Sequence, residues 1–345
     1  MADGIYLRTY LAPFAQWLDE PGVTDILVNR PGEVWIDGPR GLQRLDAPEI
    51  TETILQRLAQ QIAAYACQGM SREHPLLAAT LPDGSRVQIV APPATRGHMA
   101  LAIRKHDMKD LTLADYEASG AFSRSALSTS LERNRADAEL SALLDQGRLA
   151  DFVASAVRAR RNIVVSGGTG TGKTTFLNAL LKEVPSSDRL IVIEDAPELR
   201  LGHANAVGLV AVPGELGESR VDMDALLRAS LRLRPDRLMV GEIRGAEAFT
   251  FLRALNTGHP GSLTTVHANS PEGAIEQIAM LTLLAGSTLT RADVLDYARS
   301  VIDIVIQLSR VDGRRSISAI RFPRAMELAN DRAGSAIITL SRSAR

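Results

Sequence analysis

Cysteine, aromatic side chains and net charge are all scarce in this chain of 345 residues. The single cysteine, Cys67, excludes an intramolecular disulfide and a cysteine-rich metal site, and it favours a reducing compartment. Because 39 Lys and Arg nearly balance 40 Asp and Glu, no overall basic field attracts nucleic acid or an anionic membrane. Aromatic residues make up 4% of the chain, which leaves little for a platform on which bases could stack.

Long apolar runs are missing as well. No window reaches the roughly 18 apolar residues of a membrane-spanning helix, and the N-terminal MADGIYLRTYLAPFAQWLDEPG lacks the regions of a signal peptide. A hydrophobic content of 45% with 23% charged residues is typical of a soluble protein, here long enough for two domains. We therefore expect a cytoplasmic protein with no integral membrane segment and no specific nucleic-acid binding.

Residues 1–105 predict a small N-terminal α+β domain with an antiparallel sheet. Apolar spacing predicts a helix over residues 8–20, and Thr51 is placed to cap a second helix that ends near Gln68. Five β-rich runs predict the strands: two in TDILVNRPGEVWID, then LLAATL, RVQIVA and MALAIR. Residues 106–147 are polar and Ser/Ala-rich, which predicts a linker with some helical content, long enough for the domain to contact a neighbouring subunit.

Residues 148–330 predict an α/β domain. The apolar runs NIVVS, RLIVIE, RLMVGE and SLTTVHA alternate with helical segments such as DMDALLRASLRLR. Alternation of this kind is typical of a parallel sheet with helices on both faces. Residues 331–345 are predicted to form a C-terminal tail.

The stretch SGGTGTGKTT, residues 166–175, carries the strongest chemical signal. It fits G-x-x-x-x-G-K-[ST] and lies between a predicted strand and a predicted helix, the context that a phosphate-binding loop requires. Glycines let backbone N–H groups surround the phosphates, Lys173 reaches the β and γ phosphates of ATP, and the Thr174 hydroxyl binds Mg²⁺. The predicted nucleotide-binding residues are Gly167, Gly168, Thr169, Gly170, Thr171, Gly172, Lys173, Thr174 and Thr175.

Two strand ends offer a carboxylate for the metal and the attacking water. Glu242 ends RLMVGE, and we assign it to the water shell of the metal and to catalysis. Glu194 ends RLIVIE and is the second acid and water-positioning partner, so the choice of the main catalytic carboxylate stays open between the two. Asp236 precedes its strand and would point away from the phosphates.

Histidine and arginine supply further candidates. His267 follows a predicted strand, where its imidazole can bond a phosphate or Glu242, whereas His259 is as readily structural as functional. No third histidine or cysteine lies nearby, which disfavours a metal site. Arg86 and Arg104 lie in the N-terminal domain and, taken alone, are more often surface residues than groups that contact a phosphate.

Four motifs in order resemble those of the secretion ATPases: GGTGTGKTT, IVIEDAPEL, LRLRPDRLMVGEIRG and TGHPGSLTTVHAN match the Walker A, Asp, Walker B and His boxes. The N-terminal TDILVNRPGEVWID and LPDGSRVQIVAPP are similar to the traffic ATPases of type IV secretion, of VirB and TrbB type. The resemblance covers residues 11 to about 320. The cysteine-rich zinc insertion of some type II members is missing, which also favours the type IV branch.

The resemblance implies a RecA-like ATPase domain in a two-tiered homohexamer, with ATP and Mg²⁺ bound between the two domains. It also implies that Arg86 and Arg104 bring guanidinium groups to the phosphates, which reverses the expectation from the residues alone. Members work at the cytoplasmic face of the bacterial inner membrane, with inner-membrane and other ATPase components of the secretion channel as partners. They power pilus assembly and the movement of protein or DNA–protein substrates, in conjugation or effector delivery.

Two other functions compete with this interpretation. A RecA-like nucleic-acid motor needs a basic pore or stacking aromatics, which the composition disfavours. A monomeric P-loop kinase needs a lid and an acceptor site, and neither is recognisable in the sequence. Stimulation by single-stranded DNA would indicate the first, and phosphate transfer to a small acceptor the second.

Overall fold

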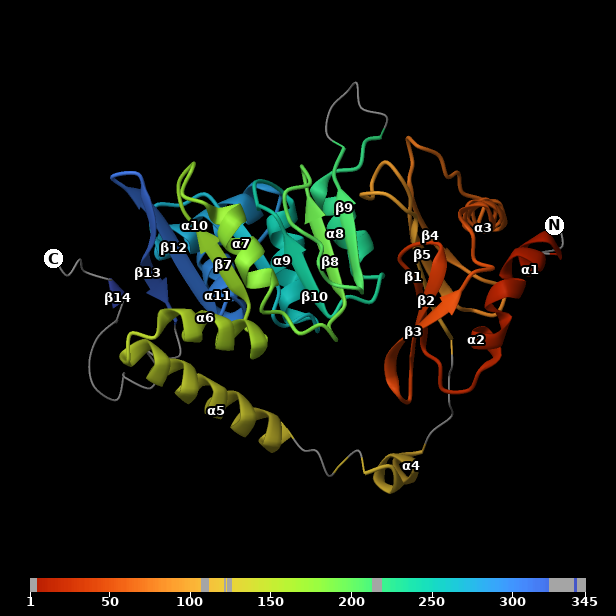
Figure 1. Ribbon diagram of the computed structural model, residues 1–345, viewed down its shortest axis with the longest axis horizontal. Helices are drawn as coiled ribbons and strands as arrows, with labels where there is room; N and C mark the ends of the chain where they lie inside the picture. Colours follow the sequence, from red (N-terminus) through yellow and green to blue (C-terminus); the bar gives the residue numbers. More distant parts are fainter. Residues whose placement is uncertain are drawn as a thin grey trace.

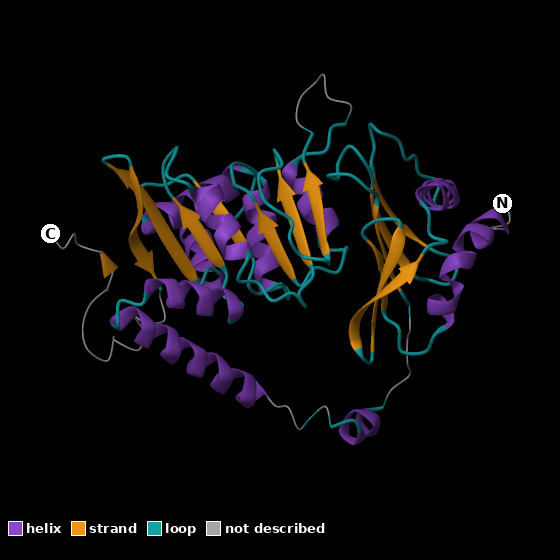
Figure 2. Ribbon diagram, in the orientation of Figure 1, coloured by secondary structure: helices purple, strands orange, loops and turns teal. Residues whose placement is uncertain are grey.

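The chain builds two β-sheets with helices around each (Figures 1 and 2). This computed structural model describes residues 5–106, 112–120, 122, 126–212, 219–322 and 338–339. The predicted C-terminal tail, residues 331–345, and parts of the predicted linker therefore lie outside the described residues, apart from the short strand at 338–339.

The N-terminal sheet is antiparallel, as predicted. It has six strands in the order β3-β2-β1-β6-β5-β4. Their bounds are β1 Asp25–Val28, β2 Gly32–Gly38, β3 Gly41–Ala47, β4 Leu76–Thr80, β5 Arg86–Val90 and β6 Ala100–Arg104. Three helices accompany it, α1 Ile5–Leu11, α2 Ala15–Asp19 and α3 Glu52–Tyr65. Strand β3 was not predicted, because its polar sequence GLQRLDA shows little of the apolar alternation that marks a strand.

Both faces of this sheet are covered, and period-2 alternation decides which residue lies on which face. Ile26 and Val28 of β1 pack with the helices in one apolar cluster. Leu27, between them, belongs to a second cluster that continues into the other domain, together with Val90 and Ala100. The sheet is therefore held between its own helices and the C-terminal domain.

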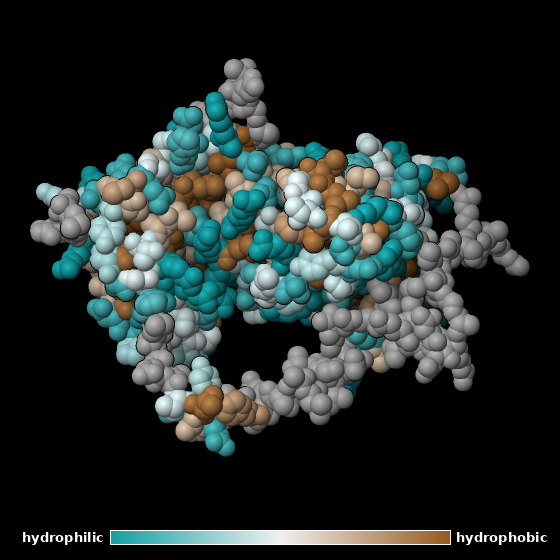
Figure 3. Space-filling model, turned by 180° about the vertical axis from the view of Figure 1, so that it is seen from behind, coloured by the Kyte–Doolittle hydropathy of each residue, from teal (hydrophilic) through white to brown (hydrophobic). Residues whose placement is uncertain are grey.

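The linker region contains two helices, α4 Leu113–Ala118 and α5 Ala126–Asp145, in agreement with the predicted helical content. Thr112 caps α4 by accepting a hydrogen bond from the backbone N–H of Asp115. Two apolar side chains of α4 are exposed, Leu113 at 78% and Tyr116 at 46%. Brown atoms mark this helix at the lower left of Figure 3, where it stands apart from the body of the molecule.

The C-terminal sheet has eight strands in the order β14-β13-β12-β7-β11-β10-β8-β9. Six neighbouring strands from β12 to β9 run parallel, which confirms the predicted α/β fold; in Figure 2 the arrows of β7, β8 and β9 point the same way. The bounds are β7 Ile163–Ser166, β8 Leu190–Glu194, β9 Ala206–Val210, β10 Arg237–Val240, β11 Leu263–Val266, β12 Ile304–Val311, β13 Arg314–Arg321 and β14 Ile338–Thr339.

Helices cover both faces of this sheet. On one face lie α8 Met223–Ser230, α9 Glu247–Asn256, α10 Pro271–Leu284 and α11 Arg291–Val301. On the other lie α5, α6 Leu149–Arg158 and α7 Lys173–Leu181. Alternate residues of the buried strands serve the two layers: Ile163 and Val165 of β7 face α6 and α7, and Val164 faces the opposite layer. Burial on both faces explains why β7 reads as an unbroken apolar run.

The two domains meet at the β9 edge of the C-terminal sheet. Thr95 and Leu209 form an isolated antiparallel bridge across the interface. Arg189 is buried beside β8, where its guanidinium donates to the side-chain oxygen of Asn29 over 2.7 Å. Burial lowers the pKa of Arg189 to about 9. The interface therefore combines apolar packing with buried polar contacts.

Candidate functional site

The glycine-rich loop joins the end of β7 to the start of α7, at the C-terminal edge of the parallel sheet. Gly170 and Gly172 have φ values of 76° and 92°, a left-handed conformation that favours glycine. A Cβ on Gly167 would lie 2.5 Å from Thr171 Oγ1 and 2.9 Å from the carbonyl oxygen of Leu308. The tight loop therefore requires glycine at these positions, and it leaves a cradle of backbone N–H groups at the N-terminus of α7.

Lys173 begins α7 and is 9% exposed. Its Nζ lies 3.2 Å from the carbonyl oxygen of Gly167, which it donates to, and 3.3 Å from His267 Nε2. It also lies 3.5 Å from Glu242 Oε1, and that oxygen is 3.0 Å from His267 Nε2. The structure thus brings together three of the predicted residues. They follow β7, β10 and β11, and β11 lies between the other two strands.

Glu242 is held by a second cation on its other oxygen. Arg244 donates from Nε to Glu242 Oε2 over 2.6 Å, and its Nη2 pairs with the same oxygen. The Nη1 of Arg244 donates to Asp195 Oδ2 over 2.6 Å. Burial lowers the pKa of Arg244, but the carboxylates of Glu242 and Asp195 outweigh it and raise the pKa overall. Glu242 is thereby fixed at 11% side-chain exposure beside the loop.

The residues present fit a magnesium nucleotide. Thr174 and Thr175 follow Lys173 in the first turn of α7, so their hydroxyl groups lie next to the cradle. Gly168 and Thr169 lie in the loop itself, where Thr171 Oγ1 closes a turn by donating to Gly168 O over 2.8 Å. One cation, one nearby carboxylate and an adjacent hydroxyl are the groups that phosphates and a hard divalent ion require.

Glu194 does not belong to the cluster of Lys173, Glu242 and His267. It ends β8 with 2% of its side chain exposed, and its Oε1 accepts hydrogen bonds from the backbone N–H groups of Glu198 and Leu199, over 2.9 and 2.8 Å. Its Oε2 forms an ion pair with Arg96 of the N-terminal domain. Arg96 also donates to the carbonyl oxygen of Leu199 over 2.6 Å. These contacts face the domain interface and make Glu194 part of the junction between the domains.

Arg86 and Arg104 lie in one row across the N-terminal sheet. The register pairs Asp37 with Asp25, Asp25 with Arg104, and Arg104 with Arg86. Arg104 Nε is 3.9 Å from Asp25 Oδ1. Asp37 at the end of this row accepts a hydrogen bond of 2.7 Å from Arg234, which precedes β10. The row therefore lies near the N-terminal ends of the parallel strands, at the opposite edge from the loop of the same chain.

His259 also lies away from the loop, before the start of β11. Its Nδ1 is 3.2 Å from the carbonyl oxygen of Ala254, and burial lowers its pKa. Its own carbonyl oxygen accepts a hydrogen bond of 2.8 Å from Ser262. Asp236 likewise precedes β10, as predicted, and it accepts a hydrogen bond of 2.7 Å from the backbone N–H of Arg189. His259 and Asp236 therefore contact backbone groups of their own surroundings and not the phosphate loop.

Two features of the site were not predicted. Arg96 lies between β5 and β6 in PPATRG, and nothing local indicates a partner in the other domain. The second is the hairpin of β12 and β13, which flanks the loop. The sequence did carry a hairpin signal there, because an Asp312-Gly313 turn separates two β-rich runs, and both turn residues have positive φ.

The fold and the site define a P-loop nucleoside triphosphatase, in which a parallel α/β sheet presents a glycine loop, a lysine and a carboxylate at one edge. The sequence model of the family described as type II/IV secretion system protein matches residues 9–312. The chain belongs to this family, and it is an ATPase.

Similar proteins cover almost the whole chain. The chain is 38% identical over 307 residues to the type IV secretion system protein VirB11 of Brucella suis, which covers 87% of this chain and 84% of that protein. It is 37% identical over 313 residues to the type IV secretion system protein PtlH homolog of Bordetella bronchiseptica, over 88% and 91% of the two chains. The crystal structure of the VirB11 ATPase from the Brucella suis type IV secretion system, in complex with sulphate, is similar with a TM-score of 0.84 at 34% identity, over 94% of this chain and 99% of that one.

Within the part of the chain that the structure describes, no helix is both long and apolar enough to span a bilayer.

Proposed function

We propose that this ATPase is a traffic motor that hydrolyses Mg²⁺-ATP in a type IV secretion or conjugation system. The observation that carries the proposal is the cluster of Lys173, Glu242 and His267, which follow three neighbouring strands and lie beside the glycine loop. The Lys173 ammonium stabilises charge on the β and γ phosphates. Glu242 orients the attacking water, and His267 links the carboxylate to the γ phosphate. Attack forms the new bond between the water oxygen and the γ phosphorus and breaks the bond from that phosphorus to the bridging oxygen, while Glu242 accepts the proton that the water loses. The products are ADP and phosphate.

Magnesium would be held by the Thr174 hydroxyl, with Glu242 bonded to its water shell. When bound, the ion neutralises charge on the phosphate oxygens. Arg244 keeps Glu242 in place, because it occupies the carboxylate oxygen that faces away from Lys173. Glu194 is assigned to the domain junction, so Glu242 is our choice for the main catalytic carboxylate.

Two variants test the chemistry. Lys173→Ala removes the charge at the phosphates, and we expect it to abolish measurable turnover and weaken Mg²⁺-ATP binding. Glu242→Gln keeps the shape of the side chain but removes the base, so ATP should stay bound while kcat falls about 10²- to 10⁴-fold. Radiolabelled ATP retention on a filter and phosphate release measure the two effects on one sample. Near-normal hydrolysis by Glu242→Gln would contradict the assignment.

We further propose that the active form is a homohexamer at the cytoplasmic face of a bacterial inner membrane, in contact with channel components and a protein or DNA–protein substrate. The named relatives belong to type IV secretion systems. The exposed Leu113 and Tyr116 of α4 offer apolar area to a neighbouring subunit. The mass in solution with and without Mg²⁺-ATP, with ATPase rates on the same fractions, tests the ring. An active monomer would refute it.

In such a ring Arg86 and Arg104 would act on the nucleotide of another subunit, because they lie at the far edge from their own loop. Mixing two inactive variants tests this. Lys173→Ala subunits supply intact arginines, and Arg104→Ala subunits supply an intact loop, so mixed rings should regain activity. Activity that stays at the sum of the two separate variants would show that the arginines do not act between subunits.

A further inference from the structure

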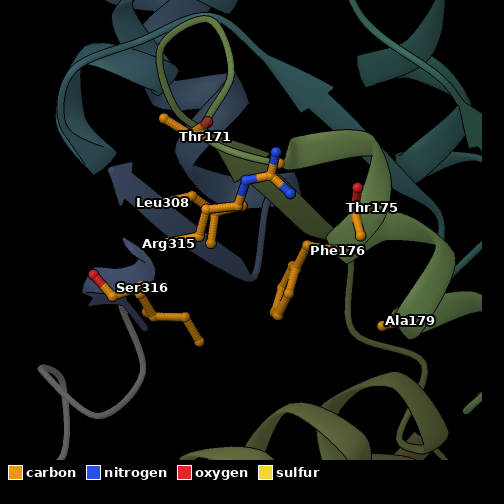
Figure 4. Close-up of a pocket in the computed structure, with 9 residues that line it drawn as sticks. Thr171, Thr175, Phe176, Ala179, Leu308, Arg315 and Ser316 are labelled. Atoms are coloured by element: carbon orange, nitrogen blue, oxygen red, sulfur yellow. The ribbon is translucent and has the colours of Figure 1, made fainter. Parts of the chain in front are cut away.

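Helix α7 has different neighbours on two of its sides. On one side lies the hairpin of β12 and β13, and a cavity of about 400 Å³, which Thr175, Phe176 and Ala179 line from α7, separates the two (Figure 4). On another side lies a stretch that follows β8 and is neither helix nor strand, residues 195–200, the 195–200 segment. A cavity wall makes fewer packing contacts than a filled interface, so this segment is the better candidate for holding α7 in place.

Asn178 joins α7 to the 195–200 segment. Its Nδ2 donates to the carbonyl oxygen of Glu198 over 3.2 Å and to that of Thr174 over 3.1 Å. Its Oδ1 accepts a hydrogen bond of 2.7 Å from the backbone N–H of Arg200. One side chain therefore bonds an acceptor and a donor of the segment and a carbonyl in the first turn of α7, directly after Lys173.

Side chains from both domains hold the middle of the segment. Glu194 Oε1 accepts hydrogen bonds from the backbone N–H groups of Glu198 and Leu199. Arg96 of the N-terminal domain donates to the carbonyl oxygen of Leu199 over 2.6 Å. A stretch with no regular secondary structure is thereby fixed through its backbone, and it cannot shift without breaking several hydrogen bonds at once.

The first residue of the segment reaches the proposed catalytic carboxylate. Asp195 Oδ2 accepts a hydrogen bond of 2.6 Å from Nη1 of Arg244, and Nε of the same guanidinium donates to Glu242 Oε2 over 2.6 Å. The side chains of Asp195 and Arg244 are 44% and 61% exposed. An exposed ion pair of this kind adds little stability, but it fixes the rotation of a planar guanidinium whose other nitrogens hold Glu242. Without Asp195, Arg244 would be free to turn toward solvent.

We propose that the 195–200 segment sets the distance between α7 and Glu242 during hydrolysis. Asn178 and Asp195 are the positioning residues at its two ends. Helix α7 brings Lys173 to the phosphates, whereas Glu242 follows β10, so the two groups come from different elements and the segment is bonded to both. The inference rests on the proposed catalytic role of Glu242. Asn178 acts through the backbone of the segment, and Asp195 acts through Arg244.

Releasing either end should slow hydrolysis without weakening nucleotide binding. Asn178→Ala removes the contacts to the segment, and α7 itself stays intact because alanine is the better helix former. Asp195→Asn keeps the size of the side chain and removes its charge. We expect each variant to lower kcat about 10- to 100-fold, the usual loss when a group that orients a catalytic residue is removed, while Mg²⁺-ADP affinity in calorimetry changes by less than about twofold.

Each variant has a matched control. Asp151→Asn breaks an Arg–Asp pair of similar geometry on α6, since Arg148 Nε and Asp151 Oδ2 are 2.8 Å apart and the two side chains are 56% and 55% exposed. Asn256→Ala makes the other substitution at an exposed residue, the last of α9. Both controls should keep the kcat of the wild type.

The double variant shows whether the two residues act through one element. Once the segment is released at one end, releasing the other end should add little, so the double variant should have about the kcat of the slower single variant. Losses that multiply would show two independent effects and overturn the proposal, as would a wild-type kcat in either single variant. An equal loss of ADP affinity and kcat in Asn178→Ala would also overturn it, because Asn178 would then serve the phosphate loop through Thr174.

Glu242→Gln separates the inference from the function. If this variant hydrolyses ATP at a near-normal rate, Glu242 is not the catalytic carboxylate, and the proposed function of Glu242 and the inference both fail. If it is inactive while Asn178→Ala and Asp195→Asn keep wild-type turnover, only the role of the 195–200 segment is refuted.

Discussion

Replacing Glu194 by Gln should loosen the N-terminal domain, although Glu194 belongs to the other domain. The side chains of Glu194 and Arg96 are 2% and 17% exposed, so their ion pair is largely withdrawn from water. In Glu194→Gln the new amide oxygen can still accept from the backbone N–H groups that Glu194 Oε1 bonds. What is lost is the charge facing Arg96, whose own pKa is lowered by burial.

The size of the effect follows from those contacts. Losing a hydrogen bond to a charged group lowers the free energy of unfolding by about 1.5–3 kcal/mol. Because the two hydrogen bonds from the backbone are retained, we expect a loss near the middle of that range. Urea slopes of about 1–3 kcal/mol per M are usual for domains of this size. A loss of about 2 kcal/mol with a slope of about 2 kcal/mol per M shifts the unfolding midpoint by about 1 M urea.

The assay uses the two tryptophans of the chain, Trp17 and Trp35, which both lie in the N-terminal domain. Their fluorescence during urea unfolding reports that domain, and Trp35 also reports the apolar cluster that the two domains share. Glu198→Gln removes the same charge from an exposed position four residues further on and should leave the midpoint unchanged. If Glu194→Gln also left the tryptophan transition in place, the two domains would not be coupled through this pair in solution.

Two further predictions concern the loop and the half-buried His259. Gly167→Ala should weaken Mg²⁺-ADP binding at least about tenfold, because a Cβ there collides with Thr171 and a backbone oxygen at a cost of about 1–3 kcal/mol. Gly202→Ala, at a glycine outside the loop with open space at its Cβ, is the control, and equal affinities of the two variants in calorimetry would contradict the reasoning. His259 has a pKa below its ordinary 6.5 in the folded protein, so the unfolded chain binds the proton more readily and the free energy of unfolding falls as pH drops below about 6.5. Urea midpoints between pH 7.5 and 5.5 should fall more steeply for wild type than for His259→Gln, and parallel slopes would rule this out.

Much of the parallel sheet is visible in the sequence, because its strands are buried on both faces. The structure forms β7, β8, β10 and β11 from the predicted runs NIVVS, RLIVIE, RLMVGE and SLTTVHA, in that order. Their order in the sheet then decided which strand ends meet. Lys173, Glu242 and His267 lie together because the strands that precede them are neighbours and end at the same edge.

The contacts between the domains were not predictable in the same way. Glu194 has the same local pattern as Glu242, a carboxylate at the end of a buried strand. Only the docked N-terminal domain brings Arg96 to one of them. The position of Arg86 and Arg104 likewise depends on which face of their sheet meets the other domain, which period-2 alternation cannot choose when both faces are apolar.

The pairing of β7 bears on how the chain folds during its synthesis. This strand carries the loop, yet both of its partners, β11 at residues 263–266 and β12 at residues 304–311, are made much later. Until then IVVS has no neighbouring strand to receive its backbone hydrogen bonds, and its apolar side chains are uncovered on a growing chain. A ribosome-bound chain that stops before residue 263 should therefore bind chaperones and retain no nucleotide, whereas release of the finished sheet would create the binding site in a single late event.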